Sequence, residues 1–328
     1  MTARQIISGF VSGLVAVVLA ACGAGDENAE RAATGDVTVV ATTTQLGDFA
    51  REVAGDRAGV RQILAANSDP HDYEPRPSDV EAVSGAAVVL RSGGDLDAWL
   101  DGVLRNAASE AQTVTLLDAV RAREGEGQKG DGGSRDAEGH EDASEIDPHW
   151  WQDPRNAISA VREIRDALVA ADPEGRDAYA AAAQRYVARL RDLDRAIAAC
   201  MAGVPESKRK LVTDHDALGY YTDRYDIDVI GTVVPARSTQ AQASAGEVAR
   251  LVRTIRAAGV TTIFPQGSGN QKLTRAIARD AGAKVGPALY ADSLGAPGTD
   301  GETYIGSMKA NTRALVNGFT GGRRACRL

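Results

Sequence analysis

GRDAYAAAAQRYVARLRDLDRAIAACMAG, residues 175–203, is the longest helical pattern in the sequence. A helix of about 27 residues is about 40 Å long, because each residue adds about 1.5 Å. Such a helix is long enough to run along two domains. The chain has 328 residues, 43% of them hydrophobic, so it has room for one large or two ordinary domains on either side of this helix.

Strand and helix patterns alternate on the N-terminal side of the long helix. Four apolar, β-branched runs predict strands, at residues 37–44, 59–66, 86–91 and 113–118. Helical patterns lie between these runs. QLGDFAREVAG has helical spacing and a glycine stop, and Ser78 and Asp79 can cap a short helix. A longer helix has Pro154 near its start and Pro173 beyond its end. Buried strands separated by helices indicate a parallel sheet covered on both faces.

The same alternation restarts after the long helix. Strands are predicted at residues 210–214, 227–234, 261–264 and 284–292, with helices between them and a last helix at 302–319. The sequence therefore predicts an α/β fold of two Rossmann-like lobes with parallel sheets, joined by one long rigid helix. We expect an N-terminal lobe at residues 37–172, a linking helix at 173–204 and a C-terminal lobe at 205–328.

The N-terminus has the pattern of an export signal. Arg4 lies in a charged start, the apolar run FVSGLVAVVLAA follows, and Leu-Ala-Ala precedes Cys22. The run is shorter than the roughly 20 residues of a membrane span. Because this cysteine resembles a lipobox, we expect a lipoprotein signal peptide at residues 1–21, lipidation of Cys22 and a flexible tether at 22–36. The alternative is an ordinary signal peptide with an incidental cysteine.

The net charge of −8 argues against nucleic acid as a partner. Much of this charge lies in residues 121–147, which lose all periodicity, are rich in glycine and predict a long mobile acidic loop.

Two cysteines remain besides Cys22, at Cys200 and Cys326. In an exported protein we expect them to form a disulfide, with two unpaired thiols as the alternative.

Three of the four histidines lie beside aspartates. His71 and His149 each end an Asp-Pro-His tripeptide, and His215 lies between two aspartates. Each follows a predicted strand, and Asp292 ends the last one. Ligands bind outside the carboxyl ends of the strands in open α/β sheets, so two facing lobes would bring these four residues into one cleft.

Three imidazoles and one carboxylate are donors suited to Zn²⁺, which four ligands enclose in a tetrahedron. The aspartates next to the histidines could bind the ring N–H groups, or could supply only negative charge that attracts a cation. The fourth histidine, His140, lies in the acidic loop. We expect it to be solvated, with auxiliary metal capture as the alternative.

The ordered motifs DPHDYEPRPSD, GGDLDAWLD, DPHWWQDPRNA, LVTDHDALGYY, TQAQASAGEV and LYADSLG give the chain a resemblance to a known family. It resembles, over about residues 37–320, the solute-binding proteins of bacterial zinc and manganese ABC transporters, of the TroA/ZnuA type. The resemblance implies two lobes linked by a long helix, with metal ligands at His71, His149, His215 and Asp292. A histidine at the third position favours zinc, because imidazole suits zinc where carboxylate suits manganese.

The resemblance implies a function outside the cytoplasm. We expect a lipid-anchored, monomeric protein without catalytic activity that captures Zn²⁺ and delivers it to an ABC-transporter permease, with a metallochaperone as a further candidate partner. A manganese-specific protein of the same family is one alternative, and a metal-stabilised adhesin is another. A secreted zinc hydrolase is the third, but it would keep an open zinc position, and no H-E-x-x-H motif is present.

Overall fold

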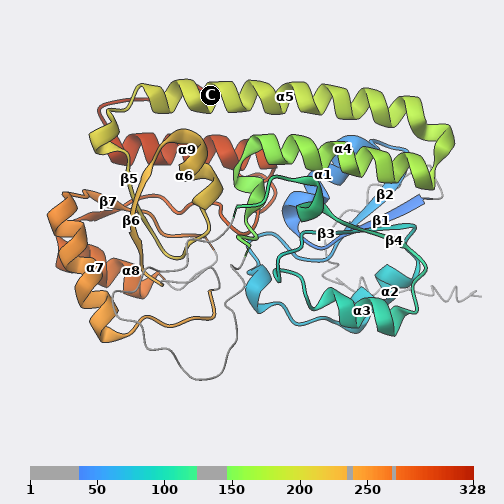
Figure 1. Ribbon diagram of the computed structural model, residues 1–328, viewed down its shortest axis with the longest axis horizontal. Helices are drawn as coiled ribbons and strands as arrows, with labels where there is room; N and C mark the ends of the chain where they lie inside the picture. Colours follow the sequence, from blue (N-terminus) through green and yellow to red (C-terminus); the bar gives the residue numbers. More distant parts are fainter. Residues whose placement is uncertain (1–36, 124–145, 235–238, 268–270) are drawn as a thin grey trace, which may run out of the picture. The chain divides into compact units, whose positions relative to one another are not determined.

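The computed structural model describes residues 37–123, 146–234, 239–267 and 271–328. Two α/β lobes with parallel sheets lie along one long helix, α5 (Arg176–Ala202), as Figure 1 shows. This arrangement confirms the predicted fold class. No helix within the described ranges is both long enough and apolar enough to cross a membrane.

The N-terminal lobe is built on one parallel sheet in the order β2-β1-β3-β4. Its strands are β1 (Val37–Ala41), β2 (Ala58–Gln62), β3 (Val88–Arg91) and β4 (Gln112–Thr115). Its helices are α1 (Thr44–Ala54), α2 (Pro77–Ser84), α3 (Leu100–Ala107) and α4 (Pro154–Ala171). Side chains alternate along β1: Val39 packs in the cluster that contains α1, α4 and α5, whereas Val40 packs with residues of α2 and α3.

The C-terminal lobe repeats this strand order with shorter strands. Its strands are β5 (Lys210–Thr213), β6 (Asp228–Thr232), β7 (Thr262–Ile263) and β8 (Lys284–Val285). Its helices are α6 (Gly219–Tyr225), α7 (Ala245–Ala258), α8 (Lys272–Ala281) and α9 (Tyr304–Thr320). The pairs β5-β6 and β7-β8 are parallel, and a bridge between Thr213 and Phe264 connects them. The resulting order β6-β5-β7-β8 matches the order of the first lobe.

Several details differ from the sequence prediction. The strands predicted at 37–44 and 113–118 end at Ala41 and Thr115, because Thr44 begins α1 and Leu116 begins a 3-10 helix. The last strand was expected at 284–292, but only Lys284–Val285 form it, with one isolated bridge at Leu289. Pro287 interrupts the ladder because proline has no N–H to donate. Ser78 lies inside the first turn of α2 and is not its cap; instead Asp79 Oδ2 accepts the backbone N–H of Arg76 at 2.7 Å.

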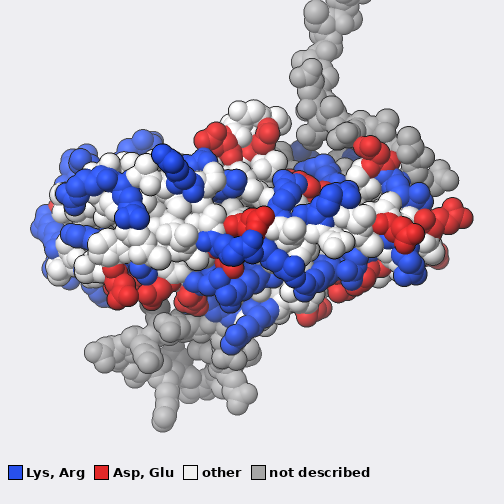
Figure 2. Space-filling view, turned by 90° about the horizontal axis from the view of Figure 1, so that it is seen from above, with Lys and Arg blue, Asp and Glu red and all other residues white. Residues whose placement is uncertain are grey.

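One hydrophobic core continues from lobe to lobe beneath α5. Leu190 and Ile197 of α5 belong to the same buried cluster as Val39 of the first sheet and Leu211 and Phe264 of the second. The opposite face of α5 is polar, and Figure 2 shows lysine and arginine side chains interspersed with acids on the side seen from above. The helix α5 is thus a structural element that both lobes share. A disulfide between Cys200 and Cys326 joins the C-terminal end of this helix to the C-terminal tail.

Asp48 of α1 is a buried carboxyl group that links three helices. It accepts a hydrogen bond from the Tyr186 hydroxyl of α5 at 3.0 Å and from the backbone N–H of Tyr304, the first residue of α9, at 3.1 Å. Burial raises the pKa of Asp48 to about 6, although both hydrogen bonds lower it.

The raised pKa predicts how Asp48→Asn changes the free energy of unfolding. A carboxyl group with a higher pKa in the folded state stabilises the protein fully below its unfolded pKa of 3.8, and this contribution is lost as pH rises through about 6. Asparagine does not ionise and so does not lose this contribution. The free energy of unfolding of the variant, measured relative to the wild type, should therefore be higher at pH 7.5 than at pH 5. Urea unfolding at both pH values measures this, and an equal difference at the two would contradict it.

Candidate metal centre

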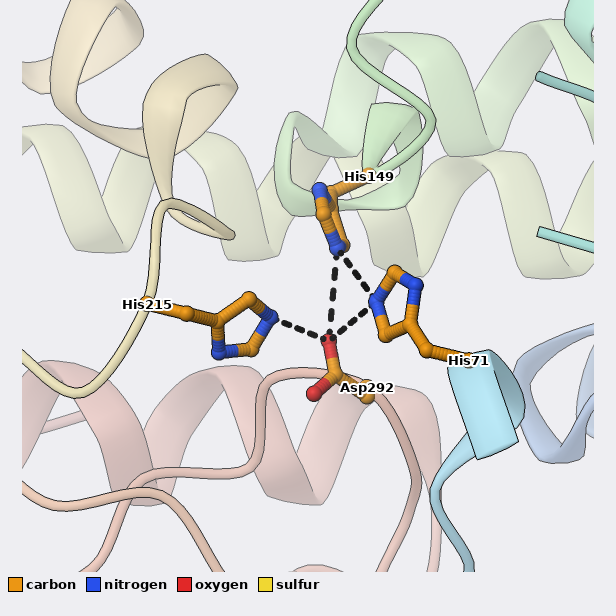
Figure 3. Close-up of side chains that lie close together, drawn as sticks. All are labelled: His71, His149, His215 and Asp292. Carbon is orange, nitrogen blue, oxygen red and sulfur yellow. Dashed lines mark hydrogen bonds and ion pairs between the residues drawn. The ribbon is translucent and has the colours of Figure 1, made fainter. Parts of the chain in front are cut away.

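Four side chains from the two lobes meet at one point (Figure 3). His71 lies in a short 3-10 helix (Pro70–Asp72) after β2, and His149 directly precedes another (Trp150–Gln152). His215 follows β5, and Asp292 follows the bridge at Leu289. Each residue offers one ligand atom, and these atoms all lie within 4.8 Å of one another. The structure therefore brings together all four residues that the sequence singled out as metal-ligand candidates.

The Oδ1 atom of Asp292 is the point on which the rings converge. It lies 3.3 Å from His215 Nε2, 3.4 Å from His149 Nε2 and 4.0 Å from His71 Nε2. The Nε2 atoms of His71 and His149 are themselves 3.3 Å apart. All three rings thus present the same nitrogen to a common space beside one carboxylate.

The two Asp-Pro-His tripeptides form the same local turn. Asp69 Oδ1 accepts the backbone N–H of His71 at 2.9 Å, and Asp147 Oδ1 accepts that of His149 at 3.0 Å. Such a side-chain turn fixes the histidine backbone. Asp147 also bonds the Nδ1 atom of the His149 ring at 2.9 Å, which leaves Nε2 directed at the centre.

Asp69 and Asp214, two further aspartates near the histidines, bind the surrounding scaffold. Asp69 is hydrogen-bonded to the side chain of Thr239. Asp214 accepts the Gln266 backbone N–H at 2.8 Å and the Thr274 hydroxyl group. Of the alternatives left open by the sequence, ring contact is therefore seen for Asp147, whereas Asp69 and Asp214 bind backbone N–H and hydroxyl groups.

Hydrogen bonds between the lobes position the segments that carry the ligands. The Trp151 indole N–H and the Gln152 amide both donate to the carbonyl oxygen of Ala291, at 3.0 and 2.9 Å, directly before Asp292. From the C-terminal lobe, the Gln240 amide donates to the His71 carbonyl oxygen at 2.7 Å. The N-terminal lobe thus helps to place Asp292, and the C-terminal lobe helps to place His71.

The buried charges at the centre depend on one another. Burial lowers the pKa of His71 to about 4. Burial also disfavours the charged form of His149, but the Asp147 and Asp292 carboxylates raise its pKa to about 9. Burial alone would raise the pKa of Asp292, yet the charges of His215 and His149 hold it well below its usual range. The centre therefore favours a carboxylate stabilised by neighbouring positive charge.

The donor atoms fit a cation. Among the described residues, both Asp292 oxygens and His215 Nε2 are buried without a hydrogen-bond partner. Buried polar atoms of this kind are costly unless something binds them. Donors on a zinc tetrahedron with bonds of about 2.0–2.1 Å lie about 3.3 Å apart. Three separations at the centre, 3.3, 3.3 and 3.4 Å, agree with that spacing, whereas the 4.0 Å between His71 Nε2 and Asp292 Oδ1 is longer.

Two of the residues singled out in the sequence, Cys22 and His140, lie outside the described residues. Sequence reasoning did not find Trp151, Gln152 or Gln240 as partners of the ligand segments. All three lie inside the motifs DPHWWQDPRNA and TQAQASAGEV, but a motif does not reveal these bonds, because each side chain binds the backbone carbonyl of a residue far away in the sequence.

The family model described as ZnuA, the periplasmic component A of a zinc-uptake complex, matches residues 39–318. Among individual relatives, the manganese-binding lipoprotein MntA of Halalkalibacterium halodurans is 29% identical over 320 residues, which cover 97% of this chain and 99% of that protein. The iron ABC transporter substrate-binding lipoprotein MtsA of Streptococcus pyogenes is 25% identical over 289 residues, or 86% of this chain and 88% of that protein.

Solved structures show the same fold. The periplasmic zinc-binding protein TroA of Treponema pallidum has a TM-score of 0.76 at 24% identity and aligns with 87% of this chain and 99% of its own. The manganese-bound periplasmic metal-binding protein of Candidatus Liberibacter asiaticus has a TM-score of 0.74 at 22% identity, covering 86% and 99%.

The Asp147 contact predicts a change in the His149 ring. Asp147→Asn removes a negative charge that stabilises the imidazolium, so the His149 pKa should fall from about 9 toward the ordinary value of 6.5. A ring-proton NMR titration of the metal-free protein measures it. Asp69→Asn is the matched control and should leave the His149 pKa in place. An unchanged pKa in Asp147→Asn would show that this carboxylate does not govern the ring.

Proposed function

Because this chain belongs to the family of ZnuA, the periplasmic component of zinc-uptake complexes, we propose that it is the zinc-binding protein of an ABC transporter. In this proposal His71, His149, His215 and Asp292 hold one Zn²⁺ between the lobes, and the protein delivers the ion to a membrane permease. The observation that carries the proposal is the convergence of three Nε2 atoms on one buried carboxylate oxygen that lacks a hydrogen-bond partner.

The donor set is the reason for choosing zinc over manganese. Three imidazoles and one carboxylate suit Zn²⁺, whereas Mn²⁺ favours sites with more oxygen ligands and six-fold coordination. For a given nitrogen and oxygen site, affinity also rises from Mn²⁺ towards Zn²⁺. Manganese is the second candidate, because the relative MntA is named for manganese and MtsA for iron.

The same arrangement favours binding over catalysis. Four protein donors would fill the tetrahedral shell of Zn²⁺ and leave no position for the water that a zinc hydrolase activates. The ring of His149 and the Asp292 side chain are almost fully buried, so a bound ion would be shielded from solvent. The ion is therefore cargo in this proposal, and no reaction is assigned to the site.

We place the protein outside the cytoplasm, held to the membrane by a lipid on Cys22. MntA and MtsA are named as lipoproteins, which supports the anchor. The Cys200–Cys326 disulfide supports an oxidising compartment, because structural disulfides are rare in the cytosol. The permease is the partner that such a binding protein requires to move its ion across the membrane.

Metal titration of the full chain tests the proposal. Metal-free protein should bind one Zn²⁺ and should prefer zinc to manganese in direct competition. Loss of the hydrogen-bond partner of a metal ligand costs roughly 10–100-fold in affinity. His215→Ala removes a metal ligand itself, so it should weaken zinc binding by more than this. His140→Ala is the matched histidine control and should keep the same stoichiometry and affinity.

Two results would contradict this assignment. Tighter binding of manganese than of zinc would favour the manganese alternative, with the same residues as ligands. Hydrolytic turnover by the zinc-loaded protein would favour an enzyme.

A further inference from the structure

Arg123 links the segment before His149 to the C-terminal lobe. Its backbone N–H donates to the Tyr220 hydroxyl group at 2.8 Å, and its Nε atom lies 2.5 Å from Asp223 Oδ2. Tyr220 and Asp223 both belong to α6. On its own lobe, the Arg123 carbonyl oxygen accepts the Asp147 N–H at 3.1 Å. One arginine therefore joins the residues around His149 to a helix of the other lobe.

The guanidinium group also faces the carboxylate that orients His149. Arg123 Nη1 lies 3.5 Å from Asp147 Oδ2, while the other oxygen of that carboxylate binds the His149 backbone and ring. The Asp147 side chain is fully buried, so an interaction with a cation there is little screened by water. The two oxygens thus have separate partners, with Arg123 on one side and His149 on the other.

The fold leaves space for this ion pair at Gly219. A Cβ atom on this first residue of α6 would lie 2.5 Å from Arg123 Nη1 and 2.8 Å from Asp147 Oδ2. Any other residue would force Arg123 or Asp147 to shift, because real contacts to a Cβ atom are longer than this. Tyr220, the next residue, adds a bond from its hydroxyl group to the Asp147 carbonyl oxygen at 3.0 Å. The start of α6 is thus shaped to receive Arg123 and Asp147 together.

We propose that Arg123 is a positioning residue for the metal centre: it holds Asp147 against His149 and anchors both to α6, and so slows the escape of bound metal. This inference rests on the zinc function proposed above. The other Asp-Pro-His turn has a different partner, since Asp69 binds the Thr239 side chain. Arg123 therefore acts on His149 and not on His71.

Zinc dissociation from the full-length protein, followed by stopped flow with an excess of chelator, tests the role of Arg123. Loss of a partner that orients a metal ligand costs roughly 10–100-fold in affinity. Arg123 contacts such a partner, Asp147, and not the ligand His149 itself. Arg123→Ala should therefore speed zinc dissociation by the lower end of that range, about tenfold. Asp223→Asn should change the rate in the same direction by a smaller factor. Its side chain is 60% exposed, so this variant should fold even if Arg123→Ala does not.

Two further variants separate positioning from general stabilisation. Arg57→Ala breaks another arginine–aspartate pair, with Asp172, between the start of β2 and the end of α4, and should leave the zinc dissociation rate unchanged. In an Asp147→Asn background, Arg123→Ala should add little, because both changes act on one chain of contacts. The melting temperature of the metal-free protein is measured for every variant.

The outcomes are distinguishable. If Arg123→Ala and Asp223→Asn lower the melting temperature but release zinc at the wild-type rate, the contact is structural only and the inference is wrong. Additive effects of Arg123→Ala and Asp147→Asn would also overturn it. If the wild type binds no zinc while these variants fold, the proposed function fails, and the role of Arg123 fails with it.

Discussion

The proposed metal centre depends on a hydrophobic core that both lobes share. Because Leu190 and Ile197 of α5 pack in one cluster with residues of both sheets, the helix fixes the distance and orientation of the lobes. The carboxyl ends of the two sheets then face one common point, where His71 and His149 meet His215 and Asp292. Wide separation of the lobes would expose this core to water. Local movement of the ligand segments is therefore the less costly way to admit or release an ion.

A buried carboxylate explains why the centre needs a cation. Asp292 is almost fully buried and both its oxygens lack a hydrogen-bond partner among the described residues, so its charge has to be balanced by something other than water. Without metal, the charges of His215 and His149 lower the pKa of Asp292, and the carboxylates of Asp147 and Asp292 together raise the pKa of His149. A divalent ion would replace the proton and bind the same three nitrogens. Metal binding should therefore compete with protonation of the histidines.

Much of the fold and the four central residues could be predicted from the sequence. The long helical pattern at 175–203 and the strand alternation are local signals, and each candidate ligand follows a strand, where α/β sheets place their ligands. Partners that act through shape or backbone atoms have no such signal. Arg123 lies within residues 121–147, where no pattern singled it out, and its contacts with Tyr220 and Asp223 depend on how α6 packs. The short last strand is a different case, because Pro287 is visible in the sequence and has no N–H to donate to a strand ladder.

X-ray absorption spectroscopy of the zinc-loaded full-length protein tests the central claim most directly. The account predicts a four-coordinate ion with three imidazole nitrogens at about 2.0–2.1 Å and one carboxylate oxygen at about 2.0–2.2 Å. His215→Ala should remove one of the imidazole contributions. A shell of five or six ligands made mainly of oxygen, or a spectrum that His215→Ala leaves unchanged, would contradict the account.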